Sequence, residues 1–383
     1  MNIIPDIDTD KIVDGVTFFT INTKISSGKM HGQSKNIKPL GFVSVKADGY
    51  TGISEIYGAT YISVGFSSIF EYLNYLIQGK SLKQTLDILN NLSIPFVSRN
   101  GIFQASLGCL ENAVFDLCAK IKGIPLYKLF ESNNQFPKIY ASGGSVICSS
   151  EDIKYESDKV INDGYQGYKI RVGLQSWDDD KKRISSINKD LKYKMVDGIC
   201  GTRVPCWTYE EASSKLSFLE IEDIYWLEEP LNPDDFQNHF HLQSDTAMHI
   251  AAGEAYSGYG ELKNLIDIGQ IDIIQFDSCH SGGLSVCKNI SDYATEKGKK
   301  TAIHVWGSAV AINTNFHLAL ILGNLDFLEK PLIELEIDSM IGKKYTTIDE
   351  LKESILEKPG IGIEIQDFEN ISIDNSFGFE YKW

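Results

Sequence analysis

The sequence contains no long run of apolar residues. No stretch approaches the roughly 20 consecutive apolar residues that a helix needs to cross a bilayer. The first eight residues contain neither the basic segment nor the apolar core of a signal peptide. We therefore expect a cytoplasmic protein without a membrane partner.

Paired cysteines and an excess of positive charge are also missing. The seven cysteines are scattered and include no CxxC pair, which predicts reduced thiols and argues against a disulfide framework or a zinc site. Lys and Arg number 36 against 52 Asp and Glu, a formal net charge of −16. This charge disfavours nucleic acid and anionic membranes as partners. An anionic small-molecule substrate would need a metal ion or a few local cations to hold it.

The length and apolar content predict one large domain and a smaller one. The chain has 383 residues, of which 43% are hydrophobic, enough for a full core. Residues 1–135 are expected to form an α+β capping domain, with a first strand at Val16–Asn22. A hairpin turning at Asp48-Gly49 follows. Between them, Lys24–Lys38 is predicted to be a polar loop whose His31 and basic residues could meet a substrate.

Residues 136–345 repeat one pattern, in which short apolar runs alternate with helical, polar stretches. The runs are Ile139–Gly143, Gly167–Val172, Tyr193–Asp197, Ile224–Glu228, Met248–Glu254, Ile271–Asp277, Thr301–Val305 and Phe327–Pro331. Eight strands alternating with helices predict an α/β fold, a (β/α) TIM-type barrel with its site at the C-terminal ends of the strands. Residues 346–383 are expected to begin with a helix and to pack back on the capping domain.

Three of the predicted strands end on acids. Asp197, Glu228 and Glu254 would meet at the barrel mouth, and an oxygen-only ligand set suits Mg²⁺ or Mn²⁺. One such acid alone would more often be a surface residue or a helix cap. Glu229 would face away from Glu228 in an extended chain, so we interpret it as a supporting or structural residue.

Polar groups also end the other strands. Lys169 and Arg171 point to the same face of their strand, where they could bind a substrate carboxylate, transfer protons or form a structural ion pair. Asp277 and His304 end neighbouring strands and could form a dyad in which the carboxylate orients the imidazole base. Glu329 is a candidate hydrogen-bond donor if burial keeps it protonated.

The ordered series of motifs resembles the enolase superfamily, mandelate racemase subgroup. It comprises Lys-x-Arg at 169–171, Asp197, Glu-Glu-Pro at 228–230, Gly-Glu at 253–254, Gln-x-Asp at 275–277 followed by Gly282-Gly283, His-x-Trp-Gly at 304–307 and Glu329. Gly52–Glu55 and Tyr140–Gly144 are similar to the family's capping strand and first barrel strand. The resemblance covers nearly the whole chain.

The resemblance implies a shared first step. Mg²⁺ held by Asp197, Glu228 and Glu254 would bind the substrate carboxylate and stabilise the enediolate formed when a base removes the α-proton. It also implies that Asp277 and His304 are the base dyad and that Glu329 hydrogen-bonds the carboxylate. Lys169 and Arg171 match the family's lysine pair on the opposite face. Relatives assemble as homo-oligomers, and we expect the same here.

The sequence departs from the family at two places. Arg171 replaces the lysine that usually acts as the opposing base, and arginine, with a pKa above about 12, is a poor proton acceptor. Ile199 stands where the family usually has Asn, and the loop 198–206 is longer than usual. A single base favours β-elimination of water from an acid sugar, an aldonate or aldarate. The alternatives are an isomerase of the superfamily (lactone cycloisomerase, epimerase or racemase) and a barrel that only binds a ligand.

Overall fold

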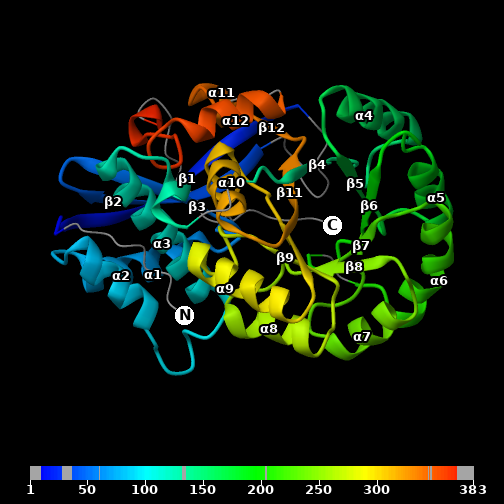
Figure 1. Cartoon of the computed structure of the whole chain (residues 1–383), viewed down its shortest axis with the longest axis horizontal. Coiled ribbons are helices and arrows are strands. Elements are labelled where there is room, and N and C mark those ends of the chain that lie inside the picture. Colours follow the sequence, from blue (N-terminus) through cyan, green and yellow to red (C-terminus); the bar gives the residue numbers. More distant parts are fainter. Residues whose placement is uncertain are drawn as a thin grey trace.

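The computed structural model describes residues 10–27, 37–59, 61–131, 135–202, 205–343, 345 and 347–368. A four-stranded sheet in the order β12-β1-β2-β3 lies beside a closed barrel of eight strands in the order β10-β11-β4-β5-β6-β7-β8-β9 (Figure 1). The barrel strands pair in parallel, whereas the strands of the separate sheet pair antiparallel. The predicted TIM-type barrel with an α+β cap is confirmed.

The cap is built on the predicted hairpin. Strands β1 (Val13–Ser27), β2 (Ile37–Ala47) and β3 (Tyr50–Ile56) form its antiparallel core. Asp48 and Gly49 both have positive φ, 52° and 80°, as a tight hairpin turn between β2 and β3 requires. The expected loop over Lys24–Lys38 is wrong at both ends, because β1 continues to Ser27 and β2 begins at Ile37. His31 lies outside the described residues.

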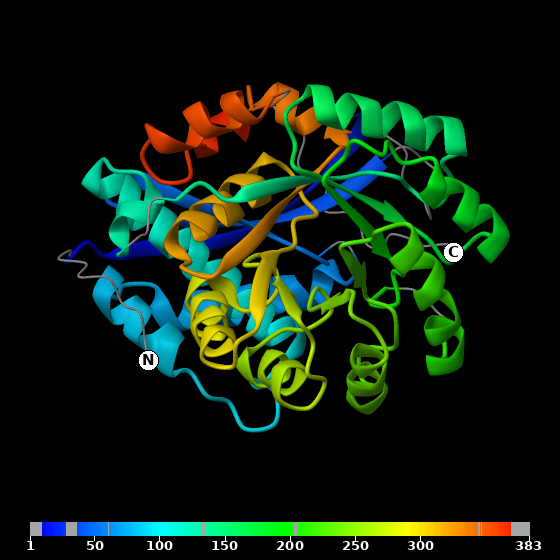
Figure 2. The same ribbon diagram turned by 45° about the vertical axis from the view of Figure 1, so that its right-hand side comes forward.

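All eight predicted barrel strands are confirmed. They are β4 (Lys138–Ser142), β5 (Gly167–Arg171), β6 (Tyr193–Asp197), β7 (Trp226–Glu228), β8 (His249–Ala252), β9 (Ile273–Phe276), β10 (Lys300–Ile303) and β11 (Leu325–Pro331). The helices of the outer layer are α4 (Ser150–Asn162), α5 (Trp177–Ser185), α6 (Tyr209–Ile221), α7 (Phe236–Ser244), α8 (Tyr259–Asp267), α9 (Gly283–Glu296) and α10 (Ala309–Ile321). Figure 2 shows these helices ranged around the barrel.

The remaining elements belong to the cap and its connections. They are α1 (Ser63–Ile77), α2 (Leu82–Asn91), α3 (Gly101–Lys122), the 3-10 helix η1 (Leu126–Leu129), β12 (Glu334–Leu335), α11 (Glu336–Met340), α12 (Ile348–Leu356) and η2 (Ile365–Phe368). After the barrel closes, β12 pairs with β1, and Phe368 packs on Phe19 and Phe42 of the cap sheet. The division of the chain at residues 135 and 345 stays a prediction.

A layer of large side chains fills the barrel beneath its mouth. Its members, Tyr140, Met195, Trp226, Ala251, Ile273, Ala302 and Phe327, are fully buried and form a cluster of their own. This layer closes the barrel, so the side chains at the C-terminal ends of the strands can contact a ligand only from the cap side. In the described part of the chain, no helix is long and apolar enough to cross a membrane.

Two carboxylates join the cap to the barrel at the first turn of α10. Glu55, from β3, accepts hydrogen bonds from the backbone N–H and the hydroxyl of Ser308, at 2.9 and 2.5 Å. Asp338, from α11, accepts one from the Ala309 N–H at 2.8 Å. Both carboxylates therefore satisfy N–H groups that have no partner within the helix. Since α10 follows the His304 loop directly, these contacts fix the cap against the mouth of the barrel.

Candidate active site

The predicted dyad is formed at the ends of β9 and β10. These strands pair in parallel, and the backbone N–H of His304 donates to the Phe276 carbonyl at 3.0 Å, which places His304 beside Asp277. His304 Nδ1 lies 3.1 Å from Asp277 Oδ2. The other oxygen, Asp277 Oδ1, accepts from the Cys279 N–H and from Asn315 Nδ2, both at 2.8 Å. A carboxylate held in this way favours a proton on Nδ1 and leaves Nε2 for chemistry.

His304 Nε2 faces carboxylates. It lies 3.1 Å from Glu254 Oε2 and 3.9 Å from Glu329 Oε2. Burial disfavours the imidazolium, but the charges of Glu254 and Glu329 and the contact with Asp277 outweigh it and raise the pKa of His304 well above its usual value. A cation bound to Glu254 would weaken the attraction between Glu254 and the imidazolium, which is one cause of the raised pKa of His304.

The three predicted metal ligands lie on consecutive strand ends. Asp197 and Glu228 are partners in the register of β6 and β7, and Glu254 follows β8 after one glycine. Asp197 and Glu228 are buried, and Glu254 is half-buried. Burial, followed by repulsion from Glu228, raises the pKa of Asp197 to about 7. Trp226 Nε1 and Gln275 Nε2 donate to Glu228 Oε2, at 3.0 and 2.8 Å, and so fix this carboxylate from below.

The two predicted cations point into the same cluster of acids. Lys169 Nζ donates to Glu228 Oε1 and lies 3.1 Å from Glu329 Oε1 and 3.8 Å from Asp197 Oδ2. Burial opposes its charge, but these carboxylates raise the pKa of Lys169. Arg171 donates to Ser142 Oγ and the Gly143 carbonyl, both at 3.0 Å. The pair therefore converges as its spacing predicts.

Glu329 differs from its predicted state. Burial alone would keep this acid neutral, but the charges of Lys169, His304 and Arg171 lower its pKa to about 2. It is a carboxylate at neutral pH, and its Oε2 accepts from the Val305 N–H at 3.0 Å. The surrounding cations disfavour the protonated form, and the role of Glu329 as a hydrogen-bond donor stays a prediction.

Glu229 also departs from its predicted geometry. Its φ is +40°, so the chain is not extended there and the alternation along the strand does not apply. Glu229 Oε1 accepts from the Gly253 N–H at 2.8 Å, whereas Oε2 is buried without a hydrogen-bond partner. A Cβ on Gly201 would approach the carboxylates of both Glu229 and Glu254 to within 3.3 Å. Glu229 therefore faces Glu254 and belongs to the acidic side of the site.

The residues of this acidic side fit a divalent cation by their chemistry. In the rotamers present, no group of three His, Cys, Asp or Glu side chains among the described residues surrounds a metal position. The cluster nevertheless holds negative charge that its partners do not fully satisfy. Glu229 Oε2 has no partner, and repulsion from Glu228 adds to the effect of burial in raising the pKa of Asp197. Among the described residues, Lys169 is the cation that lies between Asp197 and Glu228. A hard cation with oxygen ligands satisfies this charge.

Several residues of the site were not identified as such from the sequence. Asn315, on α10, fixes Asp277 from a helix, and Tyr57, after β3, places its ring 5.6 Å from the His304 ring. The Trp306 ring lies 4.5 Å from the Arg171 guanidinium carbon. Asn315 and Tyr57 come from segments far from the strand ends, so barrel periodicity gives no signal for them. Trp306 is visible in the His-x-Trp-Gly motif.

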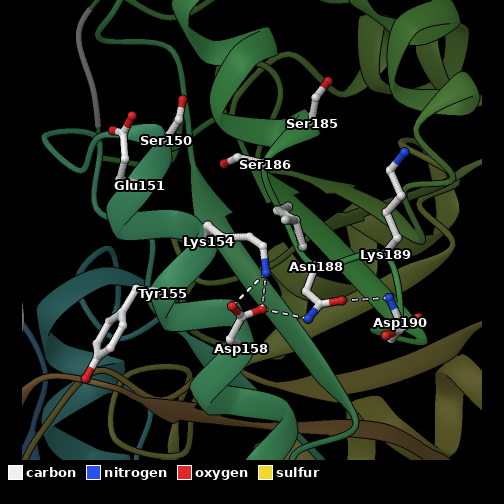
Figure 3. Close-up of a pocket in the computed structure, with 11 residues that line it drawn as sticks. Ser150, Glu151, Lys154, Tyr155, Asp158, Ser185, Ser186, Asn188, Lys189 and Asp190 are labelled. Atoms are coloured by element: carbon white, nitrogen blue, oxygen red, sulfur yellow. Dashed lines mark hydrogen bonds and ion pairs between the residues drawn. The ribbon is translucent and has the colours of Figure 1, made fainter.

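Two hollows of the surface differ in their relation to this site. A narrow cleft beside Arg171 and Trp306 is lined by Ser142–Gly144, Glu156, Leu332 and Ile333. A wider groove lies on the outside of the barrel, between α4 and the segment 185–190 (Figure 3). It contains the exposed Lys154–Asp158 ion pair and none of the predicted site residues. The cleft, and not the groove, belongs to the site.

Comparisons with known proteins find a family model and relatives that match this chain. A family model described as "Enolase C-terminal domain-like" matches residues 152–369. The chain is 25% identical over 326 residues to an arabinonate dehydratase from Saccharolobus solfataricus, covering 84% of this chain and 86% of that protein.

Solved structures share the fold. The 3,6-anhydro-D-galactonate cycloisomerase of Zobellia galactanivorans superposes with a TM-score of 0.77 at 23% identity, over 95% of this chain and 100% of that one. A Bradyrhizobium enolase complexed with magnesium and mandelic acid gives a TM-score of 0.80 at 18% identity, over 95% and 99%.

Proposed function

Because the chain belongs to the enolase C-terminal domain-like family, we propose that it removes the α-proton of a carboxylate substrate and dehydrates an acid sugar to a 2-keto-3-deoxy acid. One observation carries the proposal. Among the described residues, His304 is the only imidazole at a strand end that is held by a carboxylate. Its ring faces a cluster of buried acids, and Arg171 occupies the position of a second base.

The metal site would be formed by Asp197, Glu228 and Glu254. Mg²⁺ (or Mn²⁺) bound there would stabilise the negative charge that develops on the substrate carboxylate as the α-proton leaves. Lys169, held by Glu228 and Glu329, adds a fixed positive charge beside the same position. Glu329 would then act by orienting Lys169 and the His304 loop, since its own carboxylate is ionised.

His304 would carry the proton through both steps. Its Nε2 takes the α-proton while Asp277 holds the Nδ1–H and stabilises the imidazolium. The same Nε2 then gives the proton to the β-hydroxyl as the carbon–oxygen bond breaks, and water leaves. The enol product tautomerises to the 2-keto acid, so atoms balance without an external oxidant or reductant.

Arg171 favours elimination over racemisation. Racemisation requires a proton acceptor on both faces of the α-carbon, and the guanidinium remains charged near neutral pH. The nearby acids Asp197 and Glu329 raise the pKa of Arg171 further in spite of its burial. Its planar fork suits the carboxylate or hydroxyl groups of a polyhydroxy acid.

A panel of aldonates and aldarates tests this function. The protein with Mg²⁺ is incubated with each acid, and 2-keto-3-deoxy products are detected by their reaction with semicarbazide and by mass spectrometry. We expect a product 18 Da lighter than at least one acid. Magnesium binding without a keto product from any member of the panel would contradict dehydration.

A cycloisomerase or epimerase is the second candidate. The dyad and acids would form the same enediolate, and the chain shares its fold with the cycloisomerase of Zobellia galactanivorans. Substrate analysed by NMR in D₂O separates the two reactions. Deuterium at the α-carbon, or ring opening without loss of water, indicates isomerisation, whereas loss of the β-hydroxyl indicates dehydration.

A further inference from the structure

Lys38 is a buried cation at the boundary between the cap and the barrel mouth. It lies on β2, and its side chain is only 8% exposed in total. Its Nζ donates one hydrogen bond, to the Trp306 carbonyl at 3.2 Å, and lies 4.9 Å from the centre of the Trp306 ring. No carboxylate of the described residues lies within 4 Å of it, in contrast to the still more deeply buried Lys169.

The nearest acids are already used. Burial lowers the pKa of Lys38 to about 8, and the attraction of Glu55 and Asp338 only partly opposes this. Those two carboxylates accept hydrogen bonds from the first turn of α10. Among the described residues, this buried ammonium with three donors has one hydrogen-bond acceptor, and such a group is costly unless an anion completes it.

Lys38 shares its aromatic neighbour with Arg171. The Arg171 guanidinium carbon lies 4.5 Å from the centre of the same Trp306 ring, and the repulsion between the two cations is one cause of the lowered pKa of Lys38. Trp306 follows the base His304 by two positions. Two cations of different domains are thus held around one indole beside the proposed site of proton abstraction, and the like charges gain from an anion placed near both.

We propose that Lys38 and Arg171 form a subsite for a second carboxylate of the substrate, so the preferred acid sugar is an aldarate and not an aldonate. This inference rests on the proposed dehydration. The reacting carboxylate would lie at Lys169 and the acids of β6 to β8, and the far end of the chain would reach the cap at Lys38. A phosphate fits less well, because the N-terminus of α10, a ready source of amide donors, is filled by Glu55 and Asp338.

Matched pairs of substrates test the subsite. Each pair has one hydroxyl configuration and differs only at the terminal carbon, as galactarate and galactonate do. For the wild type we expect kcat/KM to favour the aldarate by about tenfold or more, as a desolvated charge pair implies. In Lys38→Met the aldarate should lose about tenfold to hundredfold, while the aldonate changes by less than about threefold. Lys38→Arg should restore the preference.

Controls separate this role from a structural one. Lys46→Met removes an exposed lysine from the same strand and should leave kcat/KM unchanged for both substrates. Thermal unfolding of each variant reports folding. Dehydration of aldonates without an aldarate preference, or an equal loss on both substrates in Lys38→Met, overturns the subsite but leaves the proposed function intact. If neither class reacts, the proposed function fails, and the subsite fails with it.

Discussion

The two sides of the barrel mouth differ in how completely the protein satisfies their charges. On the base side, His304, Asp277 and Asn315 form an unbroken chain of contacts from β10 to α10. On the acid side, the pKa of Asp197 is raised to about 7 and Glu229 Oε2 has no partner. The fold itself therefore preorganises the base, whereas the acid side retains negative charge that the proposed cation would satisfy.

Two non-glycine residues with positive φ lie on the acid side as well. Glu229, with φ of 40°, directly follows Glu228, and Ile199, with φ of 50°, follows Asp197 by two positions. Such a conformation costs roughly 1–2 kcal/mol for a non-glycine residue and is most unusual for a β-branched one. Backbone strain, buried repulsion and an unpartnered oxygen thus coincide in one region, as expected of a binding site and not of a folding core.

Replacing His304 should have the largest effect. His304→Asn removes the only imidazole at the strand ends described, so kcat should fall by about a thousandfold or more. His241→Asn, at an exposed position of α7, is the matched control and should keep full activity. Product formation under saturating substrate and Mg²⁺ measures the loss. Near-normal turnover in His304→Asn would show that the base lies elsewhere.

Removing one charge from each side should change stability in opposite directions. Without metal, Asp197→Asn should unfold at a higher temperature than the wild type, because it removes a buried charge that repels Glu228. With Mg²⁺ at about 100 times its Kd, the wild type should gain about 2.7 kcal/mol, and Asp197→Asn should lose most of that gain.

Asp277→Asn provides the counterpart on the base side. It breaks a satisfied contact with His304, so we expect lower stability with or without Mg²⁺ and an undiminished Mg²⁺ gain. Calorimetry with EDTA or MgCl₂ compares the three proteins. If Asp197→Asn is the less stable protein in EDTA, the acid side is not strained by its charge.

The sequence predicts the positions of the site better than its electrostatic states. Periodic strands place Asp197, Glu228, Glu254, Asp277, His304 and Glu329 at one mouth, because parallel strands of a barrel must end together. Whether Glu329 is ionised depends on Lys169, His304 and Arg171 in three dimensions. The direction of the Glu229 side chain depends on its left-handed φ, and the alternation of side chains along an extended strand does not predict such a residue. Lys38 reaches the mouth only because a separate sheet is fixed against α10.

Arg171→Lys sharpens the distinction between one base and two. Lysine cannot reproduce the two bonds that Arg171 makes to Ser142 and Gly143, so dehydration should fall by about tenfold to hundredfold. A lysine can accept a proton, so recovered substrate should carry deuterium from D₂O at the α-carbon with inverted configuration. NMR of the recovered acid detects this exchange. Its absence would mean that position 171 does not address the opposite face of the substrate.

Glu111 tests whether burial alone explains the raised pKa of an acid such as Asp197, and its replacement should give the smallest effect. This residue of α3 accepts from the Ser285 N–H at 3.1 Å, and burial raises its pKa from 4.5 to about 7. The unfolded chain therefore loses this proton first, and its contribution to stability falls as pH rises from about 4.5 to 7. Glu111→Gln should remove that slope.

The dependence on Mg²⁺ separates Glu111 from Asp197. Urea unfolding at pH 5 and pH 7.5 gives the difference in stability between each variant and the wild type. For Glu111→Gln this difference should grow with pH equally in EDTA and in MgCl₂, because Glu111 is not one of the proposed Mg²⁺ ligands. Asp197→Asn, by contrast, should be more stable than the wild type in EDTA but not in MgCl₂. If both variants respond to Mg²⁺ in the same way, the raised pKa of Asp197 is caused by burial and not by repulsion among the acids at the barrel mouth.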